Sequence, residues 1–188
     1  MTREQILEAA AQIFSKKGYH ATSMSDIASA VNLQKASLYH HVDSKQEILL
    51  SLLDEALELV TNRISAVISK PIPADAKLRL AMHTYLETLT EQRDLAAILL
   101  LEHRSLKPDL QARHTPRRDR FEQLWRDLIQ GGIDEGKFKV LDVPLVTRAL
   151  LGVMNWVVTW YCAEGPLSVS EIADQYTDLI LNGFMVRE

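Results

Sequence analysis

Apolar side chains recur along this chain at intervals of three or four residues, which is the period of one face of an α-helix. The alternation of apolar and polar residues that is typical of a β-strand is not found. The pattern predicts one helix over residues 2–17 and a long helix over residues 45–69, which Pro71 ends. We therefore expect an all-α protein.

From residue 74 onward the helical period continues to the C-terminus. The run LAAILLL, residues 95–101, is so apolar that we expect it to be buried on most sides. Five helices are expected in this part of the chain, over residues 74–92, 95–106, 116–131, 143–162 and 169–186.

The helix over residues 143–162 has two apolar faces and therefore needs two packing partners. One partner can be the rest of its own domain. The other can be a second copy of the chain, with the last two helices of each copy forming a four-helix bundle. The alternative is a helix that lies at the centre of a monomer.

Residues 22–45, TSMSDIASAVNLQKASLYHHVDSK, predict two short helices joined by a tight turn. The Ser23 hydroxyl can accept from an unpaired backbone N–H at the start of the first helix, and Asp26 completes a capping box. Ala28 is small enough to let the second helix cross closely. Asn32 stands where the chain must reverse, in a left-handed conformation that Asn adopts more easily than most residues.

The second short helix is expected to bury one face and to expose the other. Ala36, Leu38 and Val42 carry its inward face, and hydrogen-bond donors and aromatic rings carry its outward face. A short helix held across its partner by a tight turn is the geometry of a helix-turn-helix whose second helix enters the major groove of DNA. Two ordinary helices of a helical protein would fit the same pattern.

The first fifty or so residues resemble the DNA-binding domain of the TetR family of bacterial transcriptional regulators. The resemblance rests on the Gly18-Tyr19 turn, the run TSMSDIA, the string QKASLYHHV and the pair Ser44-Lys45. It implies a three-helix helix-turn-helix DNA-binding domain at the N-terminus.

The chain departs from the family pattern at two positions. Asn32 stands where the family usually has Gly, and Val42 stands where many members have Phe. Neither change is expected to disturb the helices. With the helix-turn-helix domain placed at residues 1–46, the resemblance implies a helical ligand-binding and dimerisation domain over residues 47–188.

Chemistry and resemblance together suggest the contacts with a DNA operator. Gln34 can bind adenine through two hydrogen bonds, and Lys35 can reach guanine or a phosphate. His40 and His41, which could also be ordinary surface residues, are at positions where the family has groups that contact the DNA backbone. The expected DNA-binding residues are Thr22, Ser23, Ser25, Gln34, Lys35, Ser37, Tyr39, His40, His41 and Lys45.

The composition bears on the binding partner and on the cellular compartment, and it does not exclude binding to a nucleic acid. The net charge is −4, but residues 1–47 hold five Lys or Arg against five Asp or Glu, so the acidic excess lies in the remainder. Cys162 is the single cysteine, and no signal-peptide pattern opens the chain, so we expect a protein of the reducing cytoplasm. The apolar region over residues 149–163 is too short to span a bilayer, so no membrane partner is expected.

The C-terminal half is expected to bind a small hydrophobic effector that changes the spacing of two DNA-reading helices through the helix over residues 45–69. Most of the candidate lining residues would serve equally well as plain core. Asn155 differs, because an amide on an apolar helix needs a polar partner. The candidates are Met82, Tyr85, Leu89, Leu99, His103, Phe121, Leu124, Trp125, Asn155, Trp156 and Trp160.

Residues 102–126 are unusually basic, with seven Arg or Lys against four Asp or Glu. Arg113, Arg117 and Arg118 could bind the phosphates of an acyl-coenzyme A, because guanidinium groups suit phosphate. The same charges could instead form a solvated helix with ion pairs four residues apart.

The C-terminal half is also similar to the TetR subgroup that governs fatty-acid or steroid degradation and answers to acyl-coenzyme A thioesters. The resemblance rests on HRSLKPDLQARHTPRRDRF and LLGVMNWVVTWY-x-x-EGPLS. The alternative is a repressor of the same fold that controls a multidrug efflux gene and binds a drug-like inducer.

Sequence motifs of enzymes are lacking. No Glu is followed three residues later by His, as a di-iron bundle requires, and there is no phosphate-binding glycine loop, CxxC pair or HExxH. We therefore expect neither catalysis nor a cofactor or metal.

Overall fold

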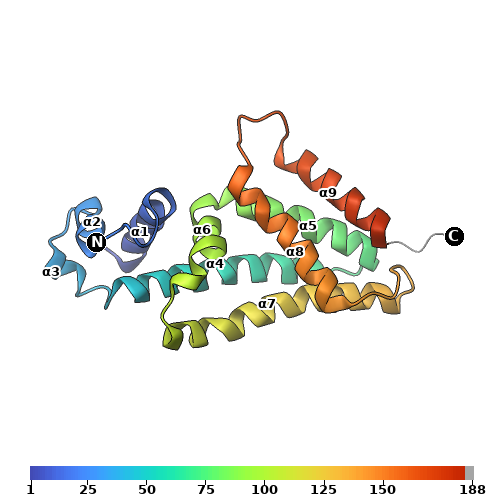
Figure 1. Ribbon diagram of the computed structural model, residues 1–188, viewed down its shortest axis with the longest axis horizontal. Helices are drawn as coiled ribbons and strands as arrows, with labels where there is room; N and C mark the ends of the chain where they lie inside the picture. Colours follow the sequence, from blue (N-terminus) through green and yellow to red (C-terminus); the bar gives the residue numbers. More distant parts are fainter. Residues whose placement is uncertain (185–188) are drawn as a thin grey trace. The chain divides into compact units, whose positions relative to one another are not determined.

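The computed structural model describes residues 1–184, which form helices and no β-strand (Figure 1). The all-α prediction is therefore confirmed. The expected helix end at Val186 lies outside the described residues. The helical segments are α1 Arg3–Lys17, α2 Met24–Ala30, α3 Lys35–Leu38, α4 Lys45–Ile68, α5 Ala74–Glu91, α6 Arg93–Ala97, the π-helical turn η1 Ile98–Glu102, the 3-10 turn η2 His103–Ser105, α7 Pro108–Asp134, α8 Val143–Trp160 and α9 Val169–Phe184.

The chain divides into two compact units. Unit 1 combines residues 1–58 with residues 92–117, and unit 2 combines residues 59–91 with the chain from Arg118 onward. Both α4 and α7 begin in unit 1 and end in unit 2. This division differs from the domain boundary expected at residue 46, because α6 and η1 pack against α1. The functional boundary stays a prediction.

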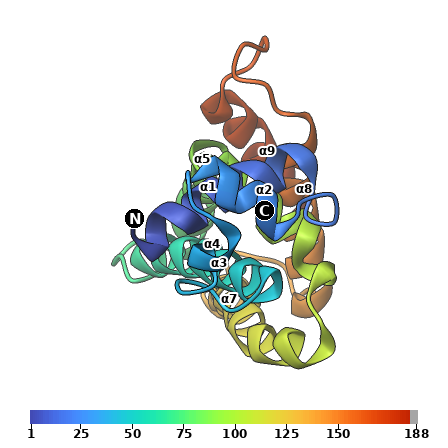
Figure 2. The same ribbon diagram turned by 90° about the vertical axis from the view of Figure 1, so that its left-hand side faces the viewer.

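Within unit 1, α1 contacts α2, and α2 contacts α3 (Figure 2). Thr2 caps the start of α1 through a capping box with Gln5, and Gly18 caps its end with a φ of 85°, which is unfavourable for other residues. Phe14, on the buried side of α1, packs edge-on against the ring of Tyr19 with 5.2 Å between centroids. The helix-turn-helix thus rests on an aromatic and aliphatic core.

The segment expected as one helix over residues 95–106 was predicted wrongly in its form. It is a short α-helix followed by the π-helical turn η1 and the 3-10 turn η2. The LAAILLL run is largely buried, as expected, because six of its seven residues are buried or half-buried and only Leu101, at its end, is 59% exposed. The periodicity of a short apolar run cannot separate these helix types.

The helix expected over residues 116–131 is longer at both ends, because α7 begins at Pro108 and continues to Asp134. Proline is tolerated at a first helical position, where no backbone donor is needed. Pro116 therefore lies inside α7 rather than at its start.

In unit 2, α5 contacts both α8 and α9. The two apolar faces expected of this helix are found in α8, where Leu150 and Val157 are buried and Val153 and Trp160 are exposed. The buried residues of α8 are Thr147, Leu150, Met154 and Val157.

By length and composition α8 is also apolar enough to cross a membrane, with a mean hydropathy of 1.3 over 18 residues. This differs from the expectation that no segment is long enough. A single helix of this kind is weak evidence for a membrane span, because core helices of globular proteins have the same properties.

Candidate nucleic-acid interface and effector site

The first helix of the predicted helix-turn-helix begins at a complete capping box. The Asp26 backbone N–H donates to the Ser23 hydroxyl at 3.2 Å, while Asp26 Oδ2 accepts from the Ser23 N–H and the Ser23 O–H, each at 2.7 Å. Lys17 Nζ lies 3.2 Å from the same carboxylate. The hydrogen bonds from Ser23, helped by Lys17, lower the pKa of Asp26 to about 2. The predicted capping box is confirmed.

The turn after α2 has the geometry that the sequence predicted. Asn32 has a φ of 54°, the single positive value of a non-glycine residue among the described residues. The Leu33 N–H donates to the Ala28 carbonyl at 2.9 Å, and the Asn32 N–H donates to the Ser29 carbonyl at 3.2 Å. The chain therefore reverses within three residues and starts α3 directly afterwards.

The second short helix is a single turn, α3 Lys35–Leu38, and residues 39–41 continue as a hydrogen-bonded turn. Leu38 and Val42 are buried, as predicted. Ala36 is exposed, so its inward placement was wrong. Ala36 precedes Leu38 by two residues, which on a helix turns it about 200° away from the buried side.

Most of the predicted DNA-binding side chains reach the surface of unit 1 around α3 and at the start of α2. Ser37 is half-buried. The geometry leaves these groups available to a duplex, but their individual contacts stay predictions. The exposed members are Ser23, Ser25, Gln34, Lys35, Tyr39, His40 and His41.

Thr22 and Lys45 have partners inside the protein. The Thr22 side chain is 2% exposed, and its hydroxyl donates to the Gly18 carbonyl at 2.8 Å. Lys45 Nζ donates to the carbonyls of Tyr19 at 2.9 Å and of Thr22 at 2.6 Å, and it lies 4.3 Å from the centroid of the Tyr19 ring. Both residues therefore brace the turn between α1 and α2. Sequence reasoning missed this role, and their phosphate contacts stay predictions.

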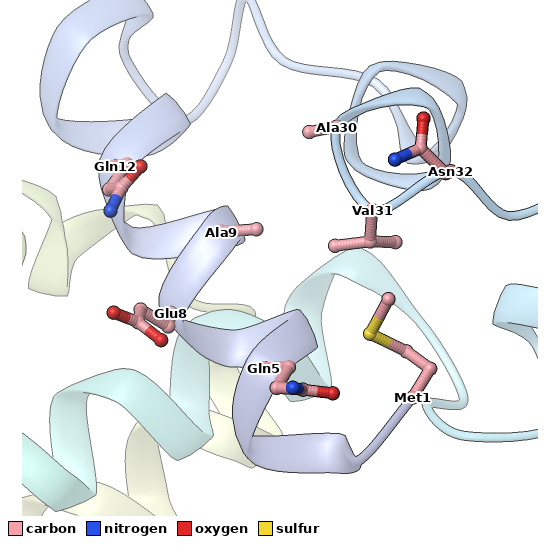
Figure 3. A pocket seen from close by; sticks show the side chains of 8 residues that line it. All are labelled: Met1, Gln5, Glu8, Ala9, Gln12, Ala30, Val31 and Asn32. Carbon is pink, nitrogen blue, oxygen red and sulfur yellow. The ribbon is translucent and has the colours of Figure 1, made fainter.

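A shallow hollow of about 360 Å³ borders the helix-turn-helix (Figure 3). It lies between α1 and the end of α2, and Asn32 is at its rim. Its lining mixes aliphatic, amide and carboxylate groups, so no single ligand chemistry is indicated. The lining residues are Met1, Gln5, Glu8, Ala9, Gln12, Ala30, Val31 and Asn32.

In unit 2, several of the predicted effector-binding residues meet in one buried cluster. The Tyr85 ring lies 5.7 Å from the ring of Phe121 and 5.7 Å from that of Trp125, measured between centroids. The Tyr85 hydroxyl donates to Asn155 Oδ1 at 2.8 Å, which supplies the partner that this amide was expected to need. Burial raises the pKa of the Tyr85 phenol, so the hydroxyl remains a neutral donor.

The indole N–H of Trp125 in this cluster is buried and has no hydrogen-bond partner. Met82 and Leu89 are buried on the same helix as Tyr85, and Leu124 is half-buried. Burying a hydrogen-bond donor without an acceptor costs free energy, so an acceptor atom placed beside the Trp125 N–H would be stabilising.

The other predicted effector-binding residues are not brought into this cluster. Trp156 and Trp160 are 65% and 45% exposed, on the outer side of α8. Leu99 and His103 belong to unit 1, in η1 and η2. Their expected part in the lining therefore has no support from the geometry of unit 2.

The predicted phosphate-binding arginines are paired with carboxylates. Arg113 Nη1 lies 3.1 Å from Glu47 Oε1, and Arg117 Nε lies 3.5 Å from Asp54 Oδ2. Their side chains are more than half exposed, so these pairs contribute little stability and can open.

Two neighbours complete this picture. Arg118 Nη2 lies 3.7 Å from Asp119 Oδ1. The buried His114, which sequence reasoning overlooked, places Nδ1 2.8 Å from the same Asp54 carboxylate that Arg117 approaches. Among residues 1–184, no group of His, Cys, Asp or Glu could hold a metal ion.

Comparison with known proteins agrees with this architecture. Residues 6–52 match the family model described as bacterial regulatory proteins, tetR family, and residues 71–184 match the model described as tetracyclin repressor-like, C-terminal domain. The chain is 31% identical over 186 residues to the HTH-type transcriptional repressor KstR2 of Mycobacterium tuberculosis, covering 96% of this chain and 92% of that protein.

Two solved structures are similar over nearly the whole length. The TetR family transcriptional regulator PfmR from Thermus thermophilus is 35% identical, with a TM-score of 0.87 and coverage of 95% of this chain and 97% of that one. AibR in complex with isovaleryl coenzyme A and operator DNA is 25% identical, with a TM-score of 0.88 and coverage of 94% and 96%. The two family models together cover both halves of the chain. This protein therefore belongs to the TetR family of transcriptional regulators.

Proposed function

We propose that this protein is a transcriptional repressor that binds a near-palindromic operator as a homodimer and is released by a small hydrophobic effector. The observation that carries the proposal is the reversal at Asn32, after which α3 begins with Lys35 exposed and Leu38 buried. That geometry, in a chain of the TetR family, suits insertion into a major groove. Such a regulator acts in the cytoplasm and catalyses no reaction.

Homodimer formation is supported by the outer side of α8. Leu145, Val153, Trp156 and Trp160 are exposed there at helical spacing, although large apolar side chains usually avoid water when they are gathered on one face. In a dimer formed through this face, a two-fold axis would relate the α3 of one subunit to the α3 of the other. Two copies of α3 about 34–36 Å apart would reach successive major grooves, so the operator should have two-fold symmetry.

For the effector we propose an acyl-coenzyme A. AibR, which shares the architecture, was solved with isovaleryl coenzyme A and operator DNA. In this chain, the rings of Tyr85, Phe121 and Trp125 in unit 2 would contact the acyl group. The unpartnered Trp125 indole N–H would bind an acceptor such as a thioester carbonyl oxygen. Arg113, Arg117 and Arg118 are exposed enough to exchange their carboxylate partners for phosphates.

A drug-like inducer is the second candidate, and one observation favours it. Carboxylates already neutralise several of the arginines, for instance Glu122, which pairs with Arg126 and lies 3.8 Å from Arg148 Nε. A site whose cations are satisfied in this way suits a neutral ligand. Control of a multidrug efflux gene would then replace control of acyl metabolism.

Two measurements test the proposal. Fluorescence anisotropy with duplexes from the promoter of the protein's own gene should show specific binding that weakens as salt rises, because phosphate contacts release counterions. Calorimetry with a long-chain acyl-coenzyme A, the free fatty acid and bare coenzyme A then identifies the effector class. Binding of the thioester alone supports an acyl-coenzyme A as the effector. If none of the three compounds gives a heat of binding, this effector class is refuted. The absence of any preferred duplex would refute the repressor itself.

A further inference from the structure

The turn between α1 and α2, residues 18–22, is held by side chains that come from a distant part of unit 1. Tyr19 at its centre is 3% exposed, and its backbone and its hydroxyl are both hydrogen-bonded. Because α2 starts directly after this turn, the position of the turn fixes the position of the helix-turn-helix. The contacts that hold Tyr19 in place therefore affect the position of α3.

One set of contacts comes from the carboxylate of Glu102, which ends the π-helical turn η1. Glu102 Oε1 accepts from the Tyr19 backbone N–H at 3.1 Å, and Glu102 Oε2 accepts from the Ser105 hydroxyl at 2.9 Å. Ser105 Oγ also lies 3.0 Å from His20 Nε2. One carboxylate thus joins η1, η2 and a turn 83 residues earlier in the chain.

A second set comes from Gln46 in the first turn of α4. Its Nε2 donates to the Tyr19 hydroxyl and to the Ser105 carbonyl, each at 2.8 Å. Its Oε1 accepts from the Lys107 backbone N–H at 2.8 Å. The Gln46 side chain therefore joins Tyr19 in the turn to Ser105 and Lys107, which lie between η1 and α7.

The π-helical form of η1 makes this linkage sensitive to a change in helix register. A π turn holds one more residue than an α turn, and such turns are rare in proteins and frequently lie at functional sites. If η1 tightened to an α-helical turn, everything after it would rotate by about 100° relative to the preceding helix. Glu102 and Ser105 could not then both keep their bonds to residues 19 and 20.

We propose that Tyr19, Gln46, Glu102 and Ser105 form a latch through which the register of η1 sets the position of the turn at residues 18–22. Glu102 and Gln46 are its positioning residues, and neither is among the expected contacts with DNA. The effect of the latch on transcription rests on the proposed function, since it supplies a route from the effector-responsive half to the helix-turn-helix. The latch itself is a property of unit 1 alone.

Hydrogen exchange at the Tyr19 amide tests the latch without DNA or effector. Glu102→Ala removes the acceptor, and it should speed Tyr19 exchange about ten- to a hundredfold, in keeping with the loss of a hydrogen bond to a charged group. Glu102→Gln keeps a carbonyl acceptor and should leave exchange within about threefold of the original protein. Glu91→Ala is the matched control, because it removes a carboxylate that bonds Arg63 in unit 2.

Gln46→Met serves if Glu102→Ala does not fold, since it keeps side-chain volume and removes both hydrogen-bonding groups. It should also speed exchange at Tyr19, by about tenfold. Tyr19 exchange that stays within about threefold of the original protein in the folded variant would overturn the latch.

Operator binding tests the consequence for regulation. The measured quantity is the ratio of operator dissociation constants with and without a saturating acyl-coenzyme A, using isovaleryl- and palmitoyl-coenzyme A as probes. Glu102→Ala should reduce this ratio by about fivefold or more, and Glu102→Gln should retain it. An unchanged ratio in Glu102→Ala would refute the regulatory role. If neither probe alters operator binding by the original protein, the proposed effector class fails, and Tyr19 exchange still decides the latch.

Discussion

Trp156→Ala should break the proposed homodimer while leaving the fold of each subunit intact. The side chain lies on the outer side of α8 and is 65% exposed, so few intramolecular contacts are lost when it is shortened. In a two-fold dimer the same residue enters the interface from both subunits, and the substitution is counted twice.

The magnitude follows from the exposed area. An indole side chain presents about 200 Å² in total, so about 130 Å² of Trp156 remains for a partner to cover. At about 25 cal/mol per Å² this area corresponds to about 3 kcal/mol, and about 2 kcal/mol remains once the area retained by Ala is subtracted. Two copies give about 4 kcal/mol, which raises the dimer dissociation constant roughly a thousandfold.

Sedimentation velocity across a range of protein concentrations measures that constant directly. Val140→Ala is the matched control, because Val140 is 89% exposed but lies outside α8 and α9. The control should keep the dissociation constant of the original protein within about twofold. A Trp156→Ala constant equally close to the original value, or an original protein that stays monomeric throughout, would refute the assignment of this face.

The remaining predictions concern the helix-turn-helix. Asn32→Ala should lower the free energy of unfolding by about 1 kcal/mol and Asn32→Gly should raise it, because the φ of 54° is unfavourable for a β-carbon, and urea denaturation measures both. Because the pKa of Asp26 is lowered, its ionised carboxylate stabilises the fold fully above about pH 4, and this stabilisation is lost as the pH falls toward 2. In Asp26→Asn the melting temperature should therefore depend less on pH between those two values. Lys45→Met should lower the free energy of unfolding by about 2 kcal/mol by removing the ammonium that bonds two carbonyls, which thermal melting would detect. Gln34→Ala should relax preference at one operator base while leaving the salt dependence of binding unchanged, as anisotropy titrations with single-base variants would reveal.

In the helix-turn-helix, most structural features could be predicted from the local sequence pattern. Ser23, Asp26 and Asn32 act on backbone groups within three or four residues of themselves, so their roles could be read from spacing alone, and the structure bears them out. Leu38 and Val42 were found for the same reason. Ala36 was misplaced, because apolar character does not tell which way a residue faces when its helix has a single turn.

In the arginine-rich segment, the ion-pair partners could not be predicted from the local sequence pattern. Counting charges over residues 102–126 identified a basic stretch, but pairing depends on which carboxylates lie opposite. Glu47 and Asp54 meet Arg113 and Arg117 from positions more than sixty residues away, and no local signal indicates that.

By itself the sequence determined the helical class, the reading turn at Asn32 and the family, because each depends on interactions between close neighbours in the chain. Only the tertiary structure decided that Lys45 braces the turn at residues 18–22, that Glu102 bonds Tyr19, and that Trp156 faces outward while Trp125 is buried. These outcomes depend on distant segments meeting in space. The free energy of such contacts is set by burial and by partners that no window of sequence contains.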